Sequence, residues 1–217
     1  MNKHFIVLFC LCMFFVTAAE AQEKTDDIAF WTTVKVDPPA IAERWFTSVI
    51  LEYRLKNDLK ETDLYSALAL IDYKIDSHWR AGLGYEFFLN KMPGKDIVEH
   101  RYYPQVTYNC KLQRFSVSLR SRVMNTFTEW KKPNWRHRNR LKISYNIKNA
   151  PLRPFVYVEP YNSLSKPFYR TNKIRYAGGC SVILAAKQSL DVFYMQESYH
   201  TRPFVRHVIG VDYSYSF

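Results

Sequence analysis

The C-terminal stretch of the chain alternates between apolar and polar residues. Every second residue from Val205 to Tyr215 is apolar, with His207 as the exception, and most residues between them are polar. Side chains of a β-strand point alternately to its two faces, so a period of two predicts one long strand with an apolar and a polar face. The strand ends at Phe217, the last residue of the chain.

Nine further segments carry strand signals and are separated by Pro, Asn, Gly and charged residues that are typical of turns. In the clearest of them, Phe115, Val117 and Leu119 alternate with polar residues, which places Leu119 on the apolar face and Ser118 on the polar one. We predict ten strands, near residues 43–56, 63–76, 78–89, 99–111, 113–125, 135–148, 153–161, 171–185, 188–197 and 204–217.

The lengths of these segments favour a membrane barrel. They exceed the roughly 5–6 residues that are usual in soluble sheets and reach the roughly 9–11 that cross a membrane when tilted. Short turns are expected near 76–77, 111–112, 149–151 and 186–187, and longer loops near 57–62, 90–98, 126–134, 162–170 and 198–203. Short periplasmic turns and long outer loops are typical of such barrels, so we expect 198–203 outside and Phe217 at the periplasmic end.

We therefore predict an all-β fold, an antiparallel up-and-down transmembrane β-barrel of about ten strands, with twelve as the alternative. Residues Ile28 to Val36, which include Trp31, also look extended. Adding them alone would give eleven strands, whereas bacterial single-chain barrels have an even number. We assign residues 22–42 to an N-terminal extended segment in the periplasm or lumen and residues 43–217 to the barrel.

The first residues have the pattern of a secretory signal peptide. A basic start with Lys3 leads into an apolar run, and Ala19-Glu20-Ala21 fits a cleavage site before Gln22. The run is shorter than the ~20 residues that a spanning helix needs. Residues 1–21 are thus predicted to be removed on export, which for a barrel indicates the outer membrane of a Gram-negative bacterium. A soluble periplasmic sandwich or lipocalin-like barrel, with the apolar stripe facing a core, is the alternative.

The net charge of the chain is +11, yet its arginines mostly alternate with apolar residues inside strands. A separate basic arm, which would indicate nucleic-acid binding, is missing from the pattern, and export also argues against such a partner. No Cys or Cys/His spacing typical of a metal site occurs, so we expect no metal or other cofactor.

An ordered set of motifs runs through the whole predicted mature chain. It comprises Leu51-Glu52-Tyr53-Arg54, Gly82-Leu83-Gly84-Tyr85-Glu86, Glu99-His100-Arg101-Tyr102-Tyr103-Pro104-Gln105, Arg120-Ser121-Arg122, Arg138-Asn139-Arg140-Leu141 and Glu159-Pro160. Together they resemble the uncharacterised family catalogued as domain of unknown function 2490, which consists of predicted outer-membrane barrels of Gram-negative bacteria, especially Bacteroidota. The resemblance implies location and fold and brings no activity. The terminal Phe217 also resembles the signal read by the barrel-assembly machinery, which we expect as a partner beside outer-membrane lipid.

The polar face of the predicted strands carries more positive than negative charge. In a barrel this face points inward, where buried charges must be paired to be tolerated. We favour a mostly filled, Arg-rich interior of a monomeric barrel without assigned activity; a narrow anion-favouring conduit is the alternative, because rings of Arg select anions. The predicted lumen charge network comprises Glu52, Arg54, Glu86, Arg101, Arg120, Arg122, Arg140, Glu159 and Arg175.

Two further interpretations stay open. A membrane-embedded lipid-modifying hydrolase would need Ser and His with an orienting group, and only Glu99-His100 and the stretch from Trp130 to His137 offer acid–base candidates. No Gly-x-Ser-x-Gly or His-Glu-x-x-His motif occurs, so a non-enzyme is favoured and catalytic residues stay unassigned. Loop 126–134 could instead bind an outer partner, although Trp130 also fits an interfacial anchor.

Overall fold

The computed structural model describes residues 25–128, 131–165 and 169–217. The predicted signal peptide, with the first residues of the N-terminal segment, and Glu129 and Trp130 of the expected outer loop lie outside these ranges. Over the described residues the regular structure is β throughout, and no helix there is long and apolar enough to cross a membrane. The strands are β1 (Thr25–Asp37), β2 (Trp45–Lys56), β3 (Glu61–Lys74), β4 (Trp79–Met92), β5 (Lys95–Leu112), β6 (Phe115–Thr128), β7 (Lys131–Tyr145), β8 (Leu152–Ser163), β9 (Thr171–Ala185), β10 (Gln188–Tyr199) and β11 (Phe204–Ser216).

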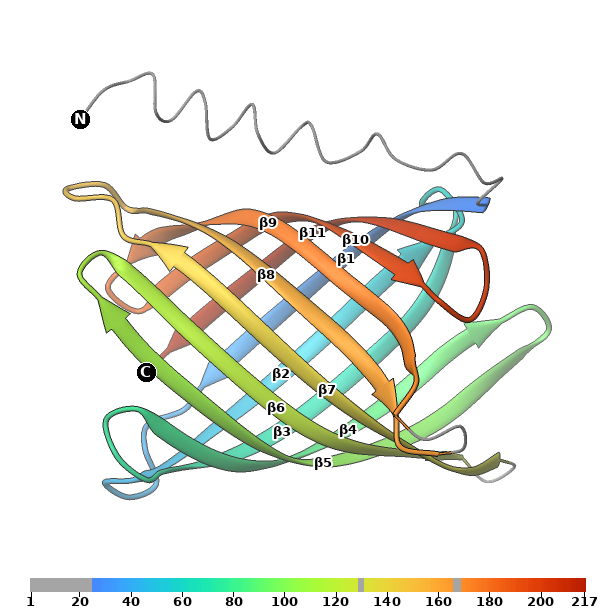
Figure 1. Ribbon diagram of the computed structural model, residues 1–217, viewed down its shortest axis with the longest axis horizontal. Helices are drawn as coiled ribbons and strands as arrows, with labels where there is room; N and C mark the ends of the chain where they lie inside the picture. Colours follow the sequence, from blue (N-terminus) through green and yellow to red (C-terminus); the bar gives the residue numbers. More distant parts are fainter. Residues whose placement is uncertain (1–24, 129–130, 166–168) are drawn as a thin grey trace.

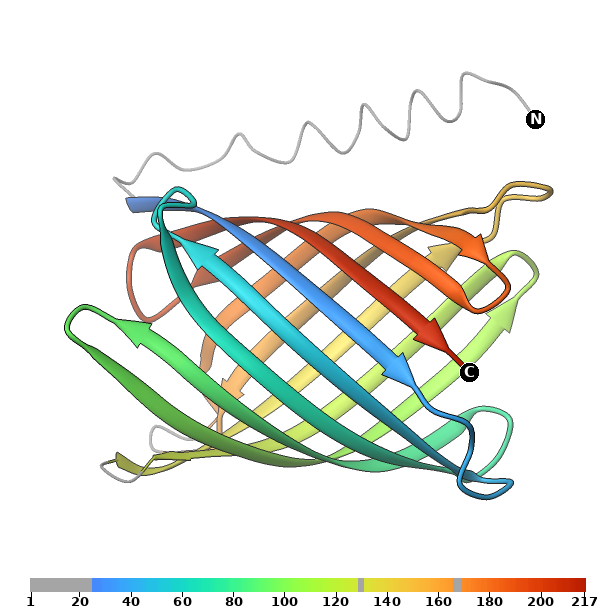
Figure 2. The same ribbon diagram turned by 180° about the vertical axis from the view of Figure 1, so that it is seen from behind.

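These strands form one closed barrel (Figures 1 and 2). From β2 to β11 each strand pairs antiparallel with the next along the chain. The barrel closes through β1, which is antiparallel to β2 and parallel to β11. Figure 2 shows this seam, with the first and last strands side by side and pointing the same way. The predicted all-β barrel fold is confirmed.

The assignment of residues 22–42 to a segment outside the barrel wall is wrong, because β1 is part of the wall. Its thirteen residues are in register with β11 from Thr25 opposite Phe204 to Asp37 opposite Ser216. The even-number rule excluded this strand because it assumes that all neighbours are antiparallel. One parallel pair closes an odd number of strands equally well, and the barrel therefore has eleven strands in the described residues.

The other ten strands occur where the alternation predicts them, but several are longer than expected. β4 and β5 continue to Met92 and Lys95, and a turn of Pro93 and Gly94 replaces the predicted loop 90–98. Gly94 has a φ of 79°, which glycine adopts without strain. Strands also continue through most of 126–134. The expected difference between short turns at one end of the barrel and long loops at the other is therefore wrong. Polar residues near the hairpin tips continue the strand pairing, as Lys91 does, whose ammonium group lies 2.6 Å from the carboxylate of Asp96.

The outer surface of the barrel is apolar and exposed. Leu51, Leu83, Leu119 and Ile209 point outward with 47–62% of their surfaces exposed. A soluble protein rarely exposes such a continuous apolar surface. The register also places Leu119 next to Leu141 on this outer face, whereas the neighbouring Ser118 is opposite Lys142 on the inner one.

The interior is packed with side chains and contains two apolar clusters. Glycines make room for the inner aromatic rings: a side chain at Gly84 would collide with the Tyr103 ring, and one at Gly210 with the Phe193 ring. Aromatic rings over glycines of neighbouring strands are a known way to fill small barrels. One cluster is Ala29, Trp31, Ala177, Met195 and Val208, and the other is Leu68, Tyr103, Met124 and Tyr161.

Candidate functional site: the interior charge network

The centre of the interior is the carboxylate of Glu159, which is completely buried. β8 directs it inward toward three arginines on β6 and β7. Arg138 donates from Nη2 to Oε2 at 2.8 Å, Arg140 donates from Nε to Oε1 at 2.6 Å, and Arg120 reaches Oε1 at 3.4 Å. The Tyr161 hydroxyl donates to Oε2 at 3.3 Å. Both oxygens of this buried carboxylate are thus satisfied by charged or hydroxyl donors.

A second buried carboxylate, Glu197 on β10, joins this centre through Arg175. Arg175 donates from Nε to Glu197 Oε1 at 2.8 Å, and its Nη1 lies 3.6 Å from Glu159 Oε2. Lys173 forms an ion pair with Glu197, and the Tyr199 hydroxyl donates to it at 2.7 Å. Arg175 therefore bridges two carboxylates that come from different strands.

A further group of ion pairs lies on the inner face of β2, β4 and β5. Arg54 donates to Glu52 from Nε and Nη2 at 2.9 and 2.8 Å, and Arg101 Nη1 lies 3.3 Å from Glu86 Oε2. The Ser66 hydroxyl lies within hydrogen-bond distance of both carboxylates, 3.4 Å from Glu52 and 3.3 Å from Glu86, and can donate its one proton to either. One serine hydroxyl on β3 thus connects the two pairs.

Arg122 is held by a different type of partner. It is buried and donates from Nε to the Gln105 side chain at 2.8 Å, and Gln105 in turn donates to Asp72 at 2.8 Å. The guanidinium also lies over the Tyr103 ring, 4.5 Å from its centroid. Arg122 is therefore connected to the carboxylate of Asp72 through the side-chain amide of Gln105.

Aromatic rings fill the space between these charges. The Trp31 ring contacts two guanidinium groups, those of Arg54 and Arg175, which lie 3.8 and 4.7 Å from its centroid. Arg140 lies 4.4 Å from the Tyr157 ring. Such contacts stabilise cations that are partly withdrawn from water. Because Glu159, Glu197 and Tyr103 have at most 1% of their surface exposed, side chains fill the middle of the interior.

All nine residues predicted for the lumen network lie on the inner face and make these contacts. The sequence interpretation omitted several residues of the network, among them Arg138, Lys173, Glu197 and Trp31. The first three alternate with outward residues on their strands, so the period of two contained the signal. Trp31 was omitted because β1 was assigned outside the wall.

The acid–base candidates His100 and His137 lie on the outer face, away from this network. His100 contacts the Tyr85 hydroxyl at 2.6 Å, and His137 contacts both Ser121 and Tyr169 at 2.8 Å. Among the described residues, no cluster of three or more His, Cys, Asp or Glu has the arrangement of a metal site.

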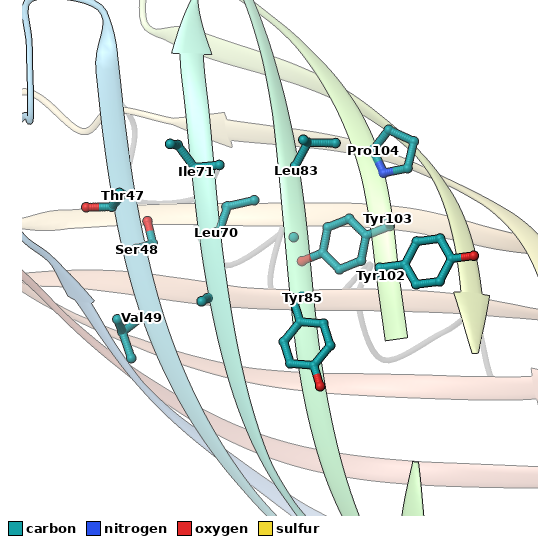
Figure 3. Close-up of a pocket in the computed structure, with 12 residues that line it drawn as sticks. Thr47, Ser48, Val49, Leu70, Ile71, Leu83, Tyr85, Tyr102, Tyr103 and Pro104 are labelled. Atoms are coloured by element: carbon teal, nitrogen blue, oxygen red, sulfur yellow. The ribbon is translucent and has the colours of Figure 1, made fainter. Parts of the chain in front are cut away.

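The outer face is hollowed by two open grooves, of about 620 and 420 Å³. The larger one crosses β2 to β5 and is lined mainly by apolar residues such as Val49, Ile71 and Leu83 (Figure 3). Because Gly84 has no side chain, the Tyr103 ring forms part of its floor. The groove follows from the small residues in the wall and is suited to contact with hydrocarbon.

The fold defines this protein as a small closed β-barrel with an exposed apolar outer surface and buried charged residues inside. The chain belongs to the family described as "Protein of unknown function (DUF2490)", whose model matches residues 28–207. This match confirms the resemblance that the sequence motifs indicated. No curated protein matches the chain.

One similar solved structure is described as a NanC porin in a rhombohedral crystal form. It covers 83% of this chain and 90% of its own chain, with a TM-score of 0.53 and 13% sequence identity. At this identity the likeness shows the fold alone, a porin-like barrel.

Proposed function

We propose that this protein is a monomeric integral outer-membrane β-barrel whose interior is filled by its Arg-rich network, so that it is a closed membrane scaffold without an open pore. The observation that carries this proposal is the inverted distribution of side chains. Leu83 and Leu119 are exposed on the outer wall, while Glu159 and Arg175 are buried inside. Only a hydrocarbon environment makes both placements favourable.

The signal-peptide pattern of residues 1–21 and the porin-like fold support the location. In this location the apolar outer wall contacts lipid, and the C-terminal strand β11 with the following Phe217 is read by the barrel-assembly machinery. Because β1 is parallel to β11, Thr25 and Phe204 lie at one end of the barrel, and Asp37 and Ser216 lie at the other.

A narrow anion-favouring conduit is the second candidate, and the charge balance around Glu159 favours it. Arg120, Arg138, Arg140 and Arg175 all lie within 3.6 Å of this one carboxylate. An excess of guanidinium groups inside a barrel attracts anions. Water-filled space along the whole interior would be required in addition, whereas the buried rings and carboxylates occupy its middle.

Planar-bilayer conductance separates the two candidates. A filled barrel gives no resolvable conductance steps above the bare bilayer. A conduit gives steps that favour anions, and Arg120→Glu reverses or weakens that preference. Arg44→Glu, in the exposed turn before β2, is the matched charge control and leaves the preference of a conduit unchanged. Anion-selective steps that respond to Arg120→Glu alone would overturn the filled barrel.

A further inference from the structure

Three histidines on the outer wall share one arrangement, in which the ring Nδ1 contacts a tyrosine hydroxyl. The distances are 2.6 Å for His100 with Tyr85 and 2.6 Å for His207 with Tyr194. Tyrosine is common at the membrane–water interface, where its hydroxyl stays hydrated and its ring contacts lipid. Two of these pairs are thus explained by an interfacial belt.

The third pair, His137 with Tyr169, contains an additional group. Nδ1 of His137 lies 2.8 Å from the Tyr169 hydroxyl, and Nε2 lies 2.8 Å from the hydroxyl of Ser121. The side-chain amide of Asn139 lies 3.5 Å from Nδ1. Both ring nitrogens of this histidine therefore have hydroxyl partners, one of which is a serine.

The two hydroxyl contacts of His137 determine which of its ring nitrogens carries the proton in a catalytic arrangement. When Nδ1 carries the proton and donates it to the Tyr169 oxygen, Nε2 is the acceptor for the Ser121 hydroxyl. A serine whose hydroxyl is hydrogen-bonded to a neutral histidine nitrogen, with the ring held by a third group, is the arrangement of an activated nucleophile. Tyr169 takes the orienting position here.

The location of the three groups is set by strand pairing. Ser121 on β6 is opposite Asn139 on β7, and His137 is the next outward residue of β7 beyond Asn139. On the other side of Ser121 and Asn139 comes the apolar pair Leu119 and Leu141. Val123 is opposite His137, and Val106 of β5 is opposite Ser121, so Ser121 lies among apolar residues of the outer wall, beside the polar groups of His137, Asn139 and Tyr169.

These apolar surroundings suit a substrate that lies in the membrane, such as the acyl ester of a lipid. The ester carbonyl lies between the hydrocarbon chains and the polar headgroup, so the chain would lie along Leu119 and Leu141 with the headgroup toward His137 and Tyr169. Ser121 and His137 are half-buried, and Tyr169 is exposed. A lipid carbonyl can therefore reach the serine from the side of the membrane.

We propose that Ser121 and His137 form a nucleophile–base pair that cleaves the acyl ester of a membrane lipid on the outer face of the barrel. The proposal rests on the membrane location proposed above and is independent of whether the interior conducts.

The reaction proceeds in two balanced steps. Ser121 Oγ attacks the ester carbonyl and its proton passes to His137 Nε2; the C–O bond to the lipid alcohol then breaks, and the alcohol leaves with that proton. Water next attacks the acyl-serine, again giving a proton to His137, and the acyl-serine bond breaks to release the fatty acid and restore the serine hydroxyl.

Covalent labelling of the folded barrel in detergent micelles tests the pair without a chosen substrate. A fluorophosphonate probe reacts with activated serines, and mass spectrometry of the digested protein locates the label. We expect modification of Ser121, its loss in Ser121→Ala, and a rate lower by about a hundredfold or more in His137→Ala, since a general base contributes about 10²–10⁴-fold. The heat-dependent shift of the barrel on a gel shows that each variant is folded.

The chain offers matched controls for this labelling. His100→Ala and His207→Ala remove the other two outer-wall histidines and should leave the rate unchanged. Ser77 contacts His78 at 2.9 Å in an exposed turn and should stay unlabelled. Tyr169→Phe keeps the nucleophile and the base and is expected to change the pH profile of labelling, whereas a merely structural tyrosine would leave that profile as in the wild type.

An assay of fatty-acid release tests whether the ester that is cleaved belongs to a membrane lipid. The folded protein should release fatty acid from phospholipid in mixed micelles, and both Ser121→Ala and His137→Ala should abolish the release. Turnover of a water-soluble short-chain ester alone would overturn the lipid assignment. A folded barrel that neither reacts at Ser121 nor releases fatty acid would overturn the proposal, while failure to fractionate with the outer membrane would instead refute the proposed location.

Discussion

At the scale of single residues, the buried carboxylate of Glu159 is the group on which the interior charges depend. It compensates the arginines of three other strands, and few alternative anions are near. Removing one partner of a buried ion network leaves the other charges uncompensated, which costs more than the network contributes in total. Glu159 is therefore the residue whose loss affects the interior most.

Glu159→Gln tests this role. The amide keeps the shape of the side chain but leaves the arginines without their shared negative charge, so we expect the free energy of unfolding to fall by about 3–5 kcal/mol. Denaturant titration of the barrel refolded in detergent measures the change. Glu61→Gln, at the exposed start of β3, is the control and should stay within about 0.5 kcal/mol. Similar values for both variants would show that the interior charges do not hold the fold.

A pair of neighbouring residues on β6 tests which face contacts lipid. Leu119→Arg places a charge on the exposed apolar wall and should destabilise the barrel in bilayers by up to about 2–4 kcal/mol, the cost of an arginine at the bilayer midplane. Ser118→Arg places the same charge on the inner face near Lys142, where we expect a smaller loss. Unfolding measured in vesicles compares the two. Equal losses would contradict the assignment of inner and outer faces.

At the scale of elements, β1 determines how the barrel closes. The strand contributes Trp31 to the interior, and Asp27 accepts a hydrogen bond from Arg206 of β11 at 2.7 Å. These contacts join the two ends of the chain. A closed seam also leaves no strand edge with unpaired backbone groups.

Cross-linking tests the parallel seam. Val34 of β1 is opposite Tyr213 of β11, so cysteines at both positions should form a disulfide on mild oxidation, because neighbouring strands lie about 4.8 Å apart. The background is Cys110→Ser with Cys180→Ser. Val34→Cys with Ile209→Cys is displaced by about 13 Å along the strand and should not cross-link. A changed mobility on a non-reducing gel after unfolding reports the bond, and its absence from the first pair would contradict the seam.

Ten of the strands could be predicted because alternation is a local property of the sequence. The seam could not, because the same residues from Ile28 to Val36 fit either a free extended segment or a strand, and only pairing with β11 decides between them. The inner positions of Glu52, Arg120 and Glu159 likewise follow from the period of two. The contact between Ser121 and His137 depends on the register of two strands, which the spacing of residues does not reveal.

At the scale of the whole molecule, the protein combines an apolar exterior with an interior whose middle holds buried rings and ion pairs. Tyr103 and Tyr161 are central to this packing, since both belong to one interior cluster and both lie beneath arginines. The barrel is thus stabilised from within by contacts that a wide pore lacks.

Removing these two rings should open the interior. Tyr103→Ala combined with Tyr161→Ala takes away side chains that are 1% and 5% exposed, and we expect conductance steps that the wild type does not show. Tyr65→Ala with Tyr176→Ala removes two exposed outer rings and is the control, without steps. Planar bilayers measure both. A double variant that stays silent while still shifting on heating would show that other groups close the interior.

The central claim, a closed barrel in the outer membrane, is tested most directly by cell fractionation followed by gel migration with and without boiling. We predict recovery with the outer membrane and a change of migration on boiling, because a closed barrel stays compact in detergent until it is heated. Recovery in the soluble periplasmic fraction without such a change would contradict the claim, and the exposed apolar wall would then have to face a partner other than lipid.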